Sequence, residues 1–450
     1  MSNITIIGGG LVGSLLAIFL ARRGHAVRVY ERRPDPRRTD VYAGRSINLV
    51  VSHRGWTALR AAGVEQAVKA ITVPVHARLT HDREGHLNRV PYSIDNRAIW
   101  SVSRGELNRR LLNEAEKLPN VKLFFDHRCL DVDLENATCD LDHNGDKVQV
   151  KADVVFGADG AFSAVRSRMM LGRFTYGQEY IEHDYKEVAF PANPDGTPKM
   201  DPHCLHIWPR RWFMLMGLAN LDGGFTGTLF MPHHATAQSP GFDTVQGEEA
   251  VRRFFAEQFP DVEPLVPDVV EQYLRNPQSS LVIIRCDPWQ VNGRVALVGD
   301  AAHAIVPFYG EGMNAGYEDC KVLNDLLNEH GDDNWHEVLH RYATARKPNG
   351  DAIADLSLRN FVEMRDLVAD PRFLLRRRIE GSIQARHPGR WLPLYSQVKF
   401  SDIPYADAWR EGLRHDRIME EVLAMDGVVD RWDTDPTVQR AVEEKVLGLL

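Results

Sequence analysis

The stretch Asn3–Glu31, NITIIGGGLVGSLLAIFLARRGHAVRVYE, decides the fold of this chain, because it orders a strand, a glycine-rich turn, a helix and a second strand. The β-branched run Ile4–Ile7 is typical of a buried strand. The turn Gly8–Gly13 fits the pattern G-x-G-x-x-G, and the apolar residues of Leu11–Leu20 recur at helical spacing. The stretch therefore predicts a β-α-β unit.

The three glycines of this pattern, Gly8, Gly10 and Gly13, are expected to have separate roles. One permits the tight turn, one lets the backbone approach a pyrophosphate, and one allows the helix to pack closely on the strand. The start of the helix offers free N–H groups and a positive dipole end to phosphates. Glu31, at the end of the second strand, is placed to accept hydrogen bonds from an adenosine ribose. The unit thus predicts a dinucleotide site and leaves open which dinucleotide binds.

Composition narrows the class of protein. A length of 450 residues allows two or three domains. The net charge of −8, from 54 basic and 62 acidic side chains, argues against a general role in binding nucleic acid. The five scattered cysteines form no C-x-x-C pair, so we expect reduced thiols and a cytoplasmic protein. A strand that starts at residue 4 leaves no room for a signal peptide, and no apolar run reaches the ~20 residues of a membrane-spanning helix. No membrane anchor is therefore expected.

Two later stretches repeat the arrangement of an apolar strand that ends in an acid. Asp153–Gly160 displays Asp159 in a small-residue turn, and Gly293–His303 delivers Asp300. The carboxyl ends of strands are where α/β folds bind ligands. Pro307–Gly316 then opens a helix, whose glycines permit close approach to a flat ligand and whose free N–H groups favour an anionic ring oxygen. Each stretch alone could be an ordinary strand–turn–helix corner, but together they predict one nucleotide site.

This set of three stretches resembles the single-component FAD-dependent aromatic hydroxylases, the para-hydroxybenzoate hydroxylase group. A second G-x-G-x-x-G followed by a strand and an acid, which a flavin reductase with two Rossmann domains should show, is not found. The resemblance implies FAD as cofactor, with NADPH and O2 as co-substrates. It also implies hydroxylation through a flavin C4a-hydroperoxide, with no protein side chain nominated as catalytic acid or base.

Carried over to this chain, the resemblance implies particular FAD contacts. Asp300 would bond the ribityl hydroxyls, Asp159 would lie near the pyrophosphate and also serve NADPH, and Arg104 would touch the flavin. Residues 312–314 would border the pyrimidine edge of the isoalloxazine ring. The full set of expected cofactor residues is Gly8, Gly10, Leu11, Val12, Gly13, Glu31, Arg32, Arg104, Asp159, Asp300, Gly312, Met313 and Asn314.

Within the group, the chain resembles the members that hydroxylate L-kynurenine at ring position 3. The segments that carry this resemblance are Gly44–Leu49, Ser52–Gly55, Leu205–Pro209, Phe225–Phe230, Val306–Phe308 with Gly312–Asn314, and Asn360–Met364. The substrate has an α-amino acid head and an aniline ring. The resemblance implies that Arg78 binds the carboxylate, a role for which its planar fork is suited. Supporting polar groups would come from Tyr92, Asn360 and Tyr395, and the ring would lie against Phe230 and Phe308.

One residue departs from the family pattern. Glu311 stands where the family usually has glutamine, and an ionised glutamate only accepts hydrogen bonds. We expect Glu311 either to pair with the substrate ammonium or to face solvent. Three further features are not expected to take part in catalysis. His303 is expected to pack or cap, and His233–His234 lacks the acidic or cysteine companions of a metal site. The run Arg376–Arg378 is expected to be a solvated helix face, with attraction of NADPH as a minor alternative.

The predicted fold class is α/β, with a Rossmann-like FAD-binding domain, an inserted antiparallel-sheet substrate domain and a C-terminal helical region. The change of character to aromatic, strand-rich sequence at residues 185–232 favours the insertion. The expected boundaries are 1–72, 101–180 and 276–365 for the FAD-binding domain, 73–100 and 181–275 for the substrate domain, and 366–450 for the helical region. Two other functions stay open: a related hydroxylase of another anthranilate-like or phenolic substrate, and a non-catalytic flavin-binding protein. A monomer or a homodimer is expected.

Overall fold

The opening β-α-β unit forms where the glycine-rich stretch predicts it. In the computed structural model, which describes residues 1–39, 47–93, 95–367 and 370–450, strand β1 (Asn3–Ile7), helix α1 (Leu11–Arg22) and strand β2 (Ala26–Tyr30) follow one another. The two strands pair in parallel. Gly8 makes the turn between β1 and α1 with φ +108°, a conformation that glycine adopts without strain.

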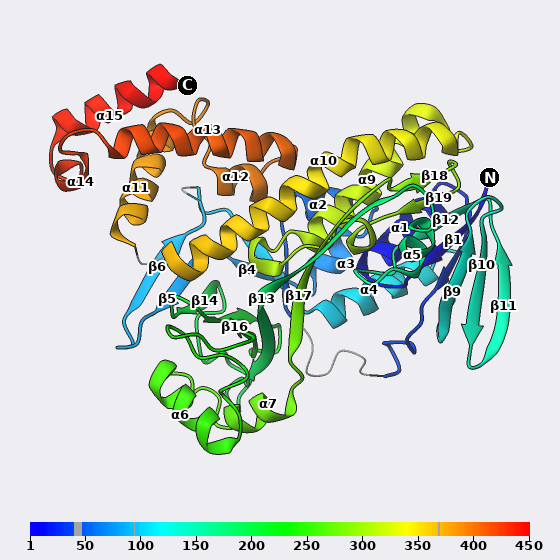
Figure 1. The fold of residues 1–450 in the computed structure, drawn as a ribbon, viewed down its shortest axis with the longest axis horizontal. Coiled ribbons are helices and arrows are strands. Elements are labelled where there is room, and N and C mark those ends of the chain that lie inside the picture. Colours follow the sequence, from blue (N-terminus) through cyan, green and yellow to red (C-terminus); the bar gives the residue numbers. More distant parts are fainter. Residues whose placement is uncertain (40–46, 94, 368–369) are drawn as a thin grey trace.

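These strands belong to a sheet with the order β18-β19-β12-β1-β2-β8, which we call the parallel sheet (Figure 1). All neighbouring strands in it are parallel except β18, which lies antiparallel at the edge. Its other strands are β8 (Val121–Phe124), β12 (Val154–Gly157), β18 (Gln290–Val291) and β19 (Val295–Leu297). Because β1, β12 and β19 are neighbours, the three nucleotide stretches that follow them begin at one edge of the sheet.

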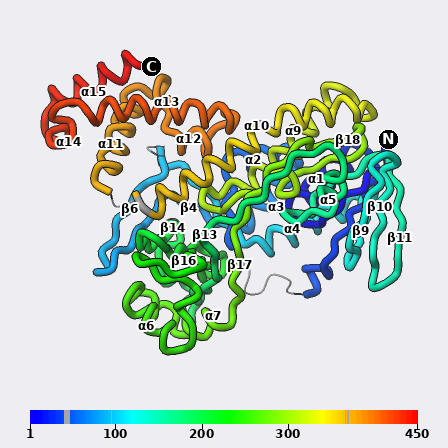
Figure 2. The backbone as a smooth tube through the Cα atoms, viewed as in Figure 1, coloured from blue at the N-terminus to red at the C-terminus, as the bar shows by residue number. Residues whose placement is uncertain are grey.

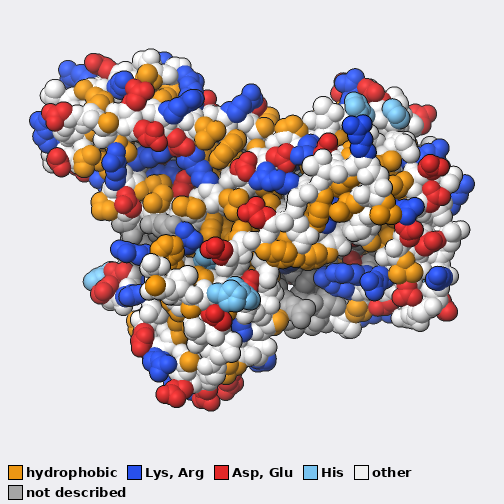
Figure 3. Space-filling model, in the orientation of Figure 1, with side chains coloured by type: hydrophobic (Ala, Val, Ile, Leu, Met, Phe, Trp, Pro, Cys, Tyr) orange, Lys and Arg blue, Asp and Glu red, His pale blue; other side chains and the backbone are white. Residues whose placement is uncertain are grey.

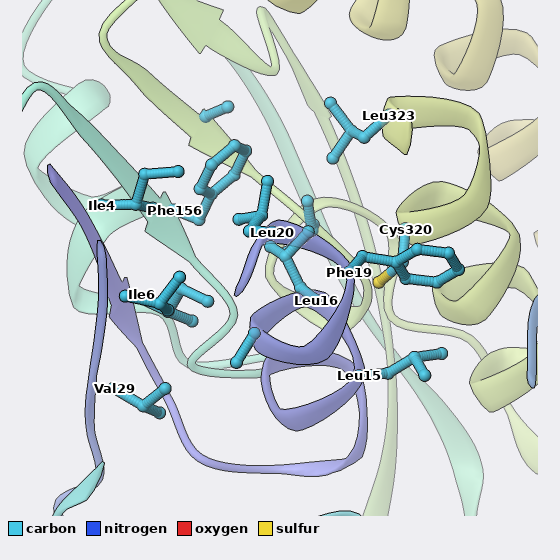
Figure 4. Packing of buried hydrophobic residues seen from close by; sticks show 14 of the residues in the cluster. Ile4, Ile6, Leu15, Leu16, Phe19, Leu20, Val29, Phe156, Cys320 and Leu323 are labelled. Carbon is cyan, nitrogen blue, oxygen red and sulfur yellow. The ribbon is translucent and has the colours of Figure 1, made fainter. Parts of the chain in front are cut away.

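Helix α1 holds the centre of the largest core. Its buried apolar side chains face Ile4 and Phe156 of the parallel sheet on one side and Leu323 of helix α9 (Gly312–His330) on the other (Figure 4). The two helices approach closely because Gly316 of α9 has no side chain: a Cβ there would lie 2.5 Å from Val12 of α1. Each fully buried leucine of such a core contributes about 1.5–3 kcal/mol.

A second sheet, which we call the aromatic sheet, has the order β17-β13-β16-β15-β14-β5-β6. Its strands are β5 (Ala77–His81), β6 (Leu87–Pro91), β13 (Thr175–Phe190), β14 (Cys204–Pro209), β15 (Met214–Ala219), β16 (Phe225–Pro232) and β17 (Ser279–Asp287). Neighbouring strands are antiparallel apart from β5 and β14. The predicted antiparallel sheet inserted among the segments of the nucleotide-binding part is therefore confirmed.

Alternation along each strand gives the aromatic sheet two different faces. Trp208 and Leu229 point to the face covered by helices α6 (Glu248–Gln258) and α7 (Val269–Arg275). Phe230 points to the opposite face, together with apolar side chains from the loop that precedes α9. The second face is the one on which the expected substrate residues lie.

Two smaller sheets complete the strands of the described part. They are β3-β7-β4, formed by Leu49–Val51, Ile99–Val102 and Val73–Val75, and β11-β10-β9, formed by Asp146–Lys151, Thr138–His143 and His127–Asp133. The short helices beside the parallel sheet are α2 (His53–Ala61), α3 (Glu65–Lys69), α4 (Arg104–Glu116), α5 (Ala164–Met169) and α8 (Asp300–His303). The apolar residues of 148–156, which suggest a single strand, are divided between β11 and β12. The chain leaves the small sheet and enters the parallel sheet through Asp153, whose carboxylate accepts a hydrogen bond from the backbone of Asn3 at 2.7 Å.

The sheets do not follow the expected domain boundaries one for one. Strand β13 runs across the expected boundary 180/181. Strand β7 runs across the expected boundary 100/101 and pairs with β4 of the expected substrate domain. The strand pairing by itself does not set those boundaries, and the division of the chain stays a proposal.

Helices form the C-terminal part, and the two chain ends lie far apart (Figure 2). The helical elements are α10 (Trp335–Val362) with a π-helical turn over Glu363–Leu367, then α11 (Pro371–Arg386), α12 (Leu394–Lys399), α13 (Tyr405–Leu423), α14 (Val428–Arg431) and α15 (Pro436–Leu449). A short 3-10 turn, η1 (Pro307–Tyr309), precedes α9. Within the described ranges, no helix combines the length and the apolar character needed to cross a membrane.

The arginine run on α11 is not simply a solvated face, so that expectation is wrong. Arg376 pairs with Glu380 and Asp416 at 2.9 and 2.7 Å, and Arg377 pairs with Glu363 at 2.7 Å. Of the three, Arg378 is half exposed. Figure 3 shows basic and acidic side chains interspersed over this helical lobe. The run therefore holds α11 against α13 and against the π-helical turn that follows α10.

Candidate active site

The three nucleotide stretches meet at the carboxyl edge of the parallel sheet. Ile7 of β1 lies opposite Gly157 of β12, and Gly157 lies opposite Leu297 of β19. The residues after these positions are the glycine turn, Asp159 and Asp300. This edge is the usual ligand-binding edge of an open parallel sheet.

The glycines of the first stretch differ in what surrounds them. A Cβ on Gly8 would lie 2.4 Å from the carbonyl oxygen of Ala158, and a Cβ on Gly13 would lie 2.0 Å from that of Gly8. Both positions are therefore closed by the protein itself. A Cβ on Gly10, the residue before α1, would meet nothing within 4 Å. Gly10 is the position that leaves room for a phosphate close to the helix start, with Leu11 and Val12 following it.

Glu31 is held beside this turn. Its carboxylate accepts hydrogen bonds from the backbone N–H groups of Gly9 and Arg33, each at 2.9 Å. Arg32 next to it is exposed. Sequence reasoning missed Asn108 of α4, whose amide donates to the carbonyl oxygen of Gly9 at 3.0 Å and ties α4, which begins at Arg104, to the turn.

Asp159 and Asp300 leave carboxylate oxygens available at this edge. Oδ2 of Asp159 accepts from the backbone of Ala164 at 2.7 Å, but its Oδ1 is buried without a hydrogen-bond partner among the described residues. Burial raises the pKa of this carboxyl above its ordinary value. Asp300 is exposed at the start of α8. A buried oxygen of this kind calls for a donor. The open position at Gly10, the orphan oxygen and the exposed acid together fit a ligand with a pyrophosphate and several hydroxyls, as FAD has.

The start of α9 offers backbone groups rather than side chains. The amide of Asn314 is fully used: Oδ1 accepts from Ser52 N at 3.0 Å, and Nδ2 donates to the carbonyl oxygens of Val50 and Gly310 at 2.9 and 3.0 Å. The first-turn N–H groups of a helix have no partner within it. Gly312, Met313 and Asn314 can therefore present N–H groups and a positive dipole end to a flat ring.

Of the two expectations for Glu311, the one that it faces solvent is wrong. Its side chain has no solvent exposure, so it does not face solvent. Its Oε1 lies 2.6 Å from Nζ of Lys399, and its Oε2 accepts from the hydroxyls of Tyr405 at 2.6 Å and Ser52 at 3.2 Å. Both oxygens thus already have partners within the protein, and the alternative that Glu311 pairs with a substrate ammonium stays a prediction. The partner Lys399, 88 residues away, had no signal in the sequence.

Arg78 lies in an aromatic enclosure on β5. Its guanidinium carbon is 4.9 Å from the ring centre of Tyr395 and 5.5 Å from that of Tyr92, and these two rings stack at 5.3 Å. Its Nε and the Tyr92 hydroxyl are buried without a hydrogen-bond partner among the described residues, and no described carboxylate forms an ion pair with it. Burial acts to lower the pKa of Arg78, but Tyr395, Tyr92 and Glu363 outweigh it, so the pKa is raised. A half-buried guanidinium without an ion-pair partner among the described residues is suited to bind a carboxylate.

An apolar wall lies in the same region. The ring centres of Phe230 and Phe308 are 5.0 Å apart, and Phe308 stacks on Phe361 at 4.1 Å. The amide of Asn360 donates to the carbonyl oxygen of Phe308 at 2.6 Å, which positions the wall. Asn360 and Tyr395 also line one cavity, beneath the C-terminal helices. The structure thus brings the expected substrate residues together in two adjoining groups.

Sequence reasoning missed Glu363 as a site residue. It lines the same cavity as Asn360, and it acts electrostatically on Arg78. Arg359 and Arg377 hold it at 3.1 and 2.7 Å, and they outweigh the effect of burial to keep its pKa below the ordinary value. Its place three residues after Asn360, one helical turn along the same face, was the available signal.

His303 packs as expected. Its Nε2 lies 2.6 Å from Oδ2 of the buried Asp319, and its ring stacks on Trp289 at 5.0 Å. Arg346 of α10 binds the other oxygen of Asp319 at 2.7 Å. Burial would raise the pKa of Asp319, but His303 and Arg346 hold it well below its ordinary value. This cluster therefore holds α8, α9 and α10 together.

Only part of the segment Gly44–Leu49 can be placed, since residues 44–46 lie outside the described residues. In its remaining part, the amide of Asn48 donates to the side chain of Asn220 at 2.7 Å and to the carbonyl oxygen of Ala219 at 3.3 Å. The segment therefore joins the strand β3 to the turn of the aromatic sheet.

Known structures share this fold. The tetrameric form of 2-methyl-3-hydroxypyridine-5-carboxylic acid oxygenase matches with a TM-score of 0.67 at 20% identity, over 82% of this chain and 94% of that chain. The p-nitrophenol 4-monooxygenase PnpA from Pseudomonas putida DLL-E4 matches with a TM-score of 0.63 at 18% identity, over 96% and 98%. At this identity the likeness shows the fold, and it confirms the predicted α/β class.

Sequence comparison is more specific. Residues 1–357 match the family model described as FAD binding domain. The kynurenine 3-monooxygenase of Flavobacterium johnsoniae is 46% identical over 100% of this chain and 98% of that protein. The kynurenine 3-monooxygenase of Dictyostelium discoideum is 40% identical over 93% of each. FAD is the cofactor of the domain, and the chain belongs to the kynurenine 3-monooxygenase family of flavoprotein monooxygenases.

Proposed function

We propose that this protein uses FAD, NADPH and O2 to hydroxylate L-kynurenine at ring position 3, which gives 3-hydroxykynurenine. The observation that carries the proposal is Arg78, a half-buried side chain with a buried Nε, whose guanidinium lies beside two stacked tyrosine rings and has no ion-pair partner among the described residues. A guanidinium that is held as a cation and has no ion-pair partner is suited to a ligand that brings a negative charge. The substrate carboxylate would supply it.

The other parts of the substrate also find suitable neighbours. The hydroxyls of Tyr92 and Tyr395 flank Arg78 and can donate to the same carboxylate. Glu363, in place of the fully buried Glu311, is proposed as the acceptor for the substrate ammonium, because it lines the same cavity as Asn360 and Tyr395. Each of its oxygens accepts from one arginine and keeps a further lone pair for the ammonium. The aniline ring would lie against Phe230 and Phe308, where burial removes its apolar surface from water.

The cofactor residues are proposed at the edge of the parallel sheet. Gly8, Gly10, Leu11, Val12 and Gly13 would take the pyrophosphate, with Glu31 and Arg32 beside the adenosine ribose. Arg104, Asp159 and Asp300 would hold the remaining polar groups, and Gly312, Met313 and Asn314 would border the flavin ring.

Bound FAD would pass electrons from NADPH to O2 and so supply the oxygen chemistry. The chain's own task is to orient the ring, keep water away from it and present positive charge at the start of α9. No side chain is assigned as a catalytic acid or base. The proposal also includes the domain division given above and a cytoplasmic enzyme that acts as a monomer or a homodimer.

The deciding experiment is chromatographic detection of 3-hydroxykynurenine after incubation of the FAD-loaded protein with NADPH and L-kynurenine. NADPH oxidation should rise with L-kynurenine and stay at its basal rate with anthranilate or 4-hydroxybenzoate. Product from one of those compounds alone would replace L-kynurenine with another aromatic substrate. Bound FAD without any hydroxylated product would favour a non-catalytic flavoprotein.

A further inference from the structure

The ion pair Glu311–Lys399 lies at the start of the helix proposed for the flavin ring. Burial and, to a smaller extent, Arg78 lower the pKa of Lys399, whereas Glu311 raises it. Nζ of Lys399 lies 2.6 Å from Oε1 of Glu311 and 3.2 Å from the carbonyl oxygen of Gly310. The two side chains are 1% and 0% exposed. Two charges can be buried so completely only when each compensates the other. The pair is therefore a fixed part of the loop that leads into α9.

The position of Glu311 creates an electrostatic conflict. Glu311 precedes Gly312 as the N-cap residue of α9. Its side chain makes no capping hydrogen bond, but its Oε1 lies 3.5 Å from Nδ2 of Asn314, so a negative charge sits near the positive end of the helix dipole. The reduced flavin ring is an anion at neutral pH, and its pyrimidine edge is proposed at this same helix end. An uncompensated carboxylate there would repel the reduced ring, and it would do so strongly because the site has a low dielectric constant.

We propose that Lys399 is a positioning residue for the flavin: its ammonium neutralises Glu311 and so keeps the first turn of α9 electropositive toward the reduced ring. The inference rests on the proposed placement of the ring beside residues 312–314. It does not depend on which aromatic compound is hydroxylated.

The groups around the pair are consistent with this role. The hydroxyls of Tyr405 and Ser52 donate to Oε2 of Glu311 and stabilise it as a carboxylate. The guanidinium of Arg54 lies 4.1 Å from the centre of the Tyr405 ring and also acts on Glu311 electrostatically. Lys399 is thus the cation in direct contact with the carboxylate, and Arg54 is a more distant one.

Helix α12 connects this pair to the substrate site. Tyr395, which covers Arg78, lies four residues before Lys399 and therefore on the same face of the helix. One short helix thus carries both a wall of the carboxylate enclosure and the cation of the flavin loop. A shift of α12 would therefore move both Tyr395 and Lys399.

The test is the midpoint potential of bound FAD in K399M, E311Q and the double variant E311Q/K399M, each compared with the native enzyme without substrate. We expect K399M to lower the potential by about 30 mV, which corresponds to a tenfold loss of preference for reduced over oxidised FAD. E311Q should raise it, and the double variant should return close to the native value. K321M is the control. Lys321 forms a 2.6 Å ion pair with Asp325 within α9, away from the start of that helix, so its loss should leave the potential unchanged.

The measurement should be made at pH 6 and pH 9, because a buried charge that loses its partner can neutralise itself through a proton. The E311Q shift should be larger at pH 6, where Lys399 stays protonated, because burial lowers the pKa of Lys399 and Glu311 is the group that acts to raise it. Single-variant shifts of the same sign, or no shift at either pH, would overturn the proposal. If K399M fails to retain FAD, the comparison is made between E311Q/K399M and E311Q. The double variant should then have the lower midpoint potential, and equal potentials would overturn the proposal. The product assay on the native enzyme tests the proposed function separately, so a failure of either proposal can be told from a failure of the other.

Discussion

Replacing Gly10 with alanine should separate FAD binding from folding. Gly10 has φ −73° and ψ −171°, which alanine adopts freely, and its Cβ would meet no protein atom within 4 Å. The added methyl group instead takes the space proposed for the pyrophosphate. Because the apoprotein loses no contact, its free energy of unfolding should stay constant or rise by up to about 1 kcal/mol.

The magnitude of the binding loss follows from the contacts that the methyl group prevents. Displacing the phosphate from the helix start removes at least one charge-assisted hydrogen bond to a backbone N–H, worth about 1.5–3 kcal/mol. The dissociation constant of FAD should therefore rise by roughly 10- to 150-fold. Gly13→Ala is the contrasting variant, because its Cβ would lie 2.0 Å from the carbonyl oxygen of Gly8. It should cost the apoprotein about 1–3 kcal/mol by overpacking.

Two measurements on each apoprotein decide the matter: titration with FAD followed by flavin fluorescence, and urea unfolding. The reasoning fails if Gly10→Ala binds FAD within twofold of the native protein. It fails equally if Gly10→Ala loses as much unfolding free energy as Gly13→Ala, because the site would then be closed by protein and not open to a ligand.

Three further variants test other parts of the site. Arg78→Met should raise the KM for L-kynurenine by roughly 10- to 150-fold, from the loss of about 1.5–3 kcal/mol, with FAD content unchanged; steady-state NADPH oxidation measures it, and an unaltered KM would exclude Arg78 as the carboxylate anchor. Asp300→Ala should weaken FAD binding by a similar factor without changing apoprotein stability, because Asp300 is exposed; a drop in the urea midpoint would contradict this. Asp319, whose pKa is depressed in the folded state, contributes stability that is present above the ordinary carboxyl pKa of about 4 and is lost as pH falls below it. Asp319→Asn should lower the unfolding free energy at pH 7 by about 3–5 kcal/mol. The variant should also lose less unfolding free energy than the native protein between pH 6 and pH 3, and an equal loss would show that Asp319 does not cause the acid sensitivity.

Features that depend on short segments were predictable from the sequence. The β-α-β unit, the acids after β12 and β19, and the aromatic strands all have signals within about ten residues. Once the strands are taken as parallel neighbours, the meeting of Gly8, Asp159 and Asp300 at one edge follows. The resemblance to flavin hydroxylases also predicted that Arg78 and Tyr92 lie together, because it carries over the site residues of a known family.

Features that depend on distant partners were not predictable. The burial of Glu311 requires Lys399 and Tyr405, which lie about ninety residues further on and pack there only through the C-terminal helices. The use of the Asn314 amide depends on β3, 264 residues earlier. Composition and periodicity describe a residue's own element, whereas burial of a charge depends on what another element brings to it.

Helix α10 fixes a distance between the two halves of the site. Near its start Tyr342 donates to the carbonyl oxygen of Leu297 in β19 at 3.0 Å, and near its end Asn360 binds the backbone of Phe308 at 2.6 Å. A single inserted residue between them would turn Asn360 by about 100° and advance it by about 1.5 Å, away from the wall it positions. Length changes in this region of the chain are therefore excluded by geometry, and insertions that arise during evolution or engineering should be tolerated in surface turns such as Asn193–Thr197 but not within α10.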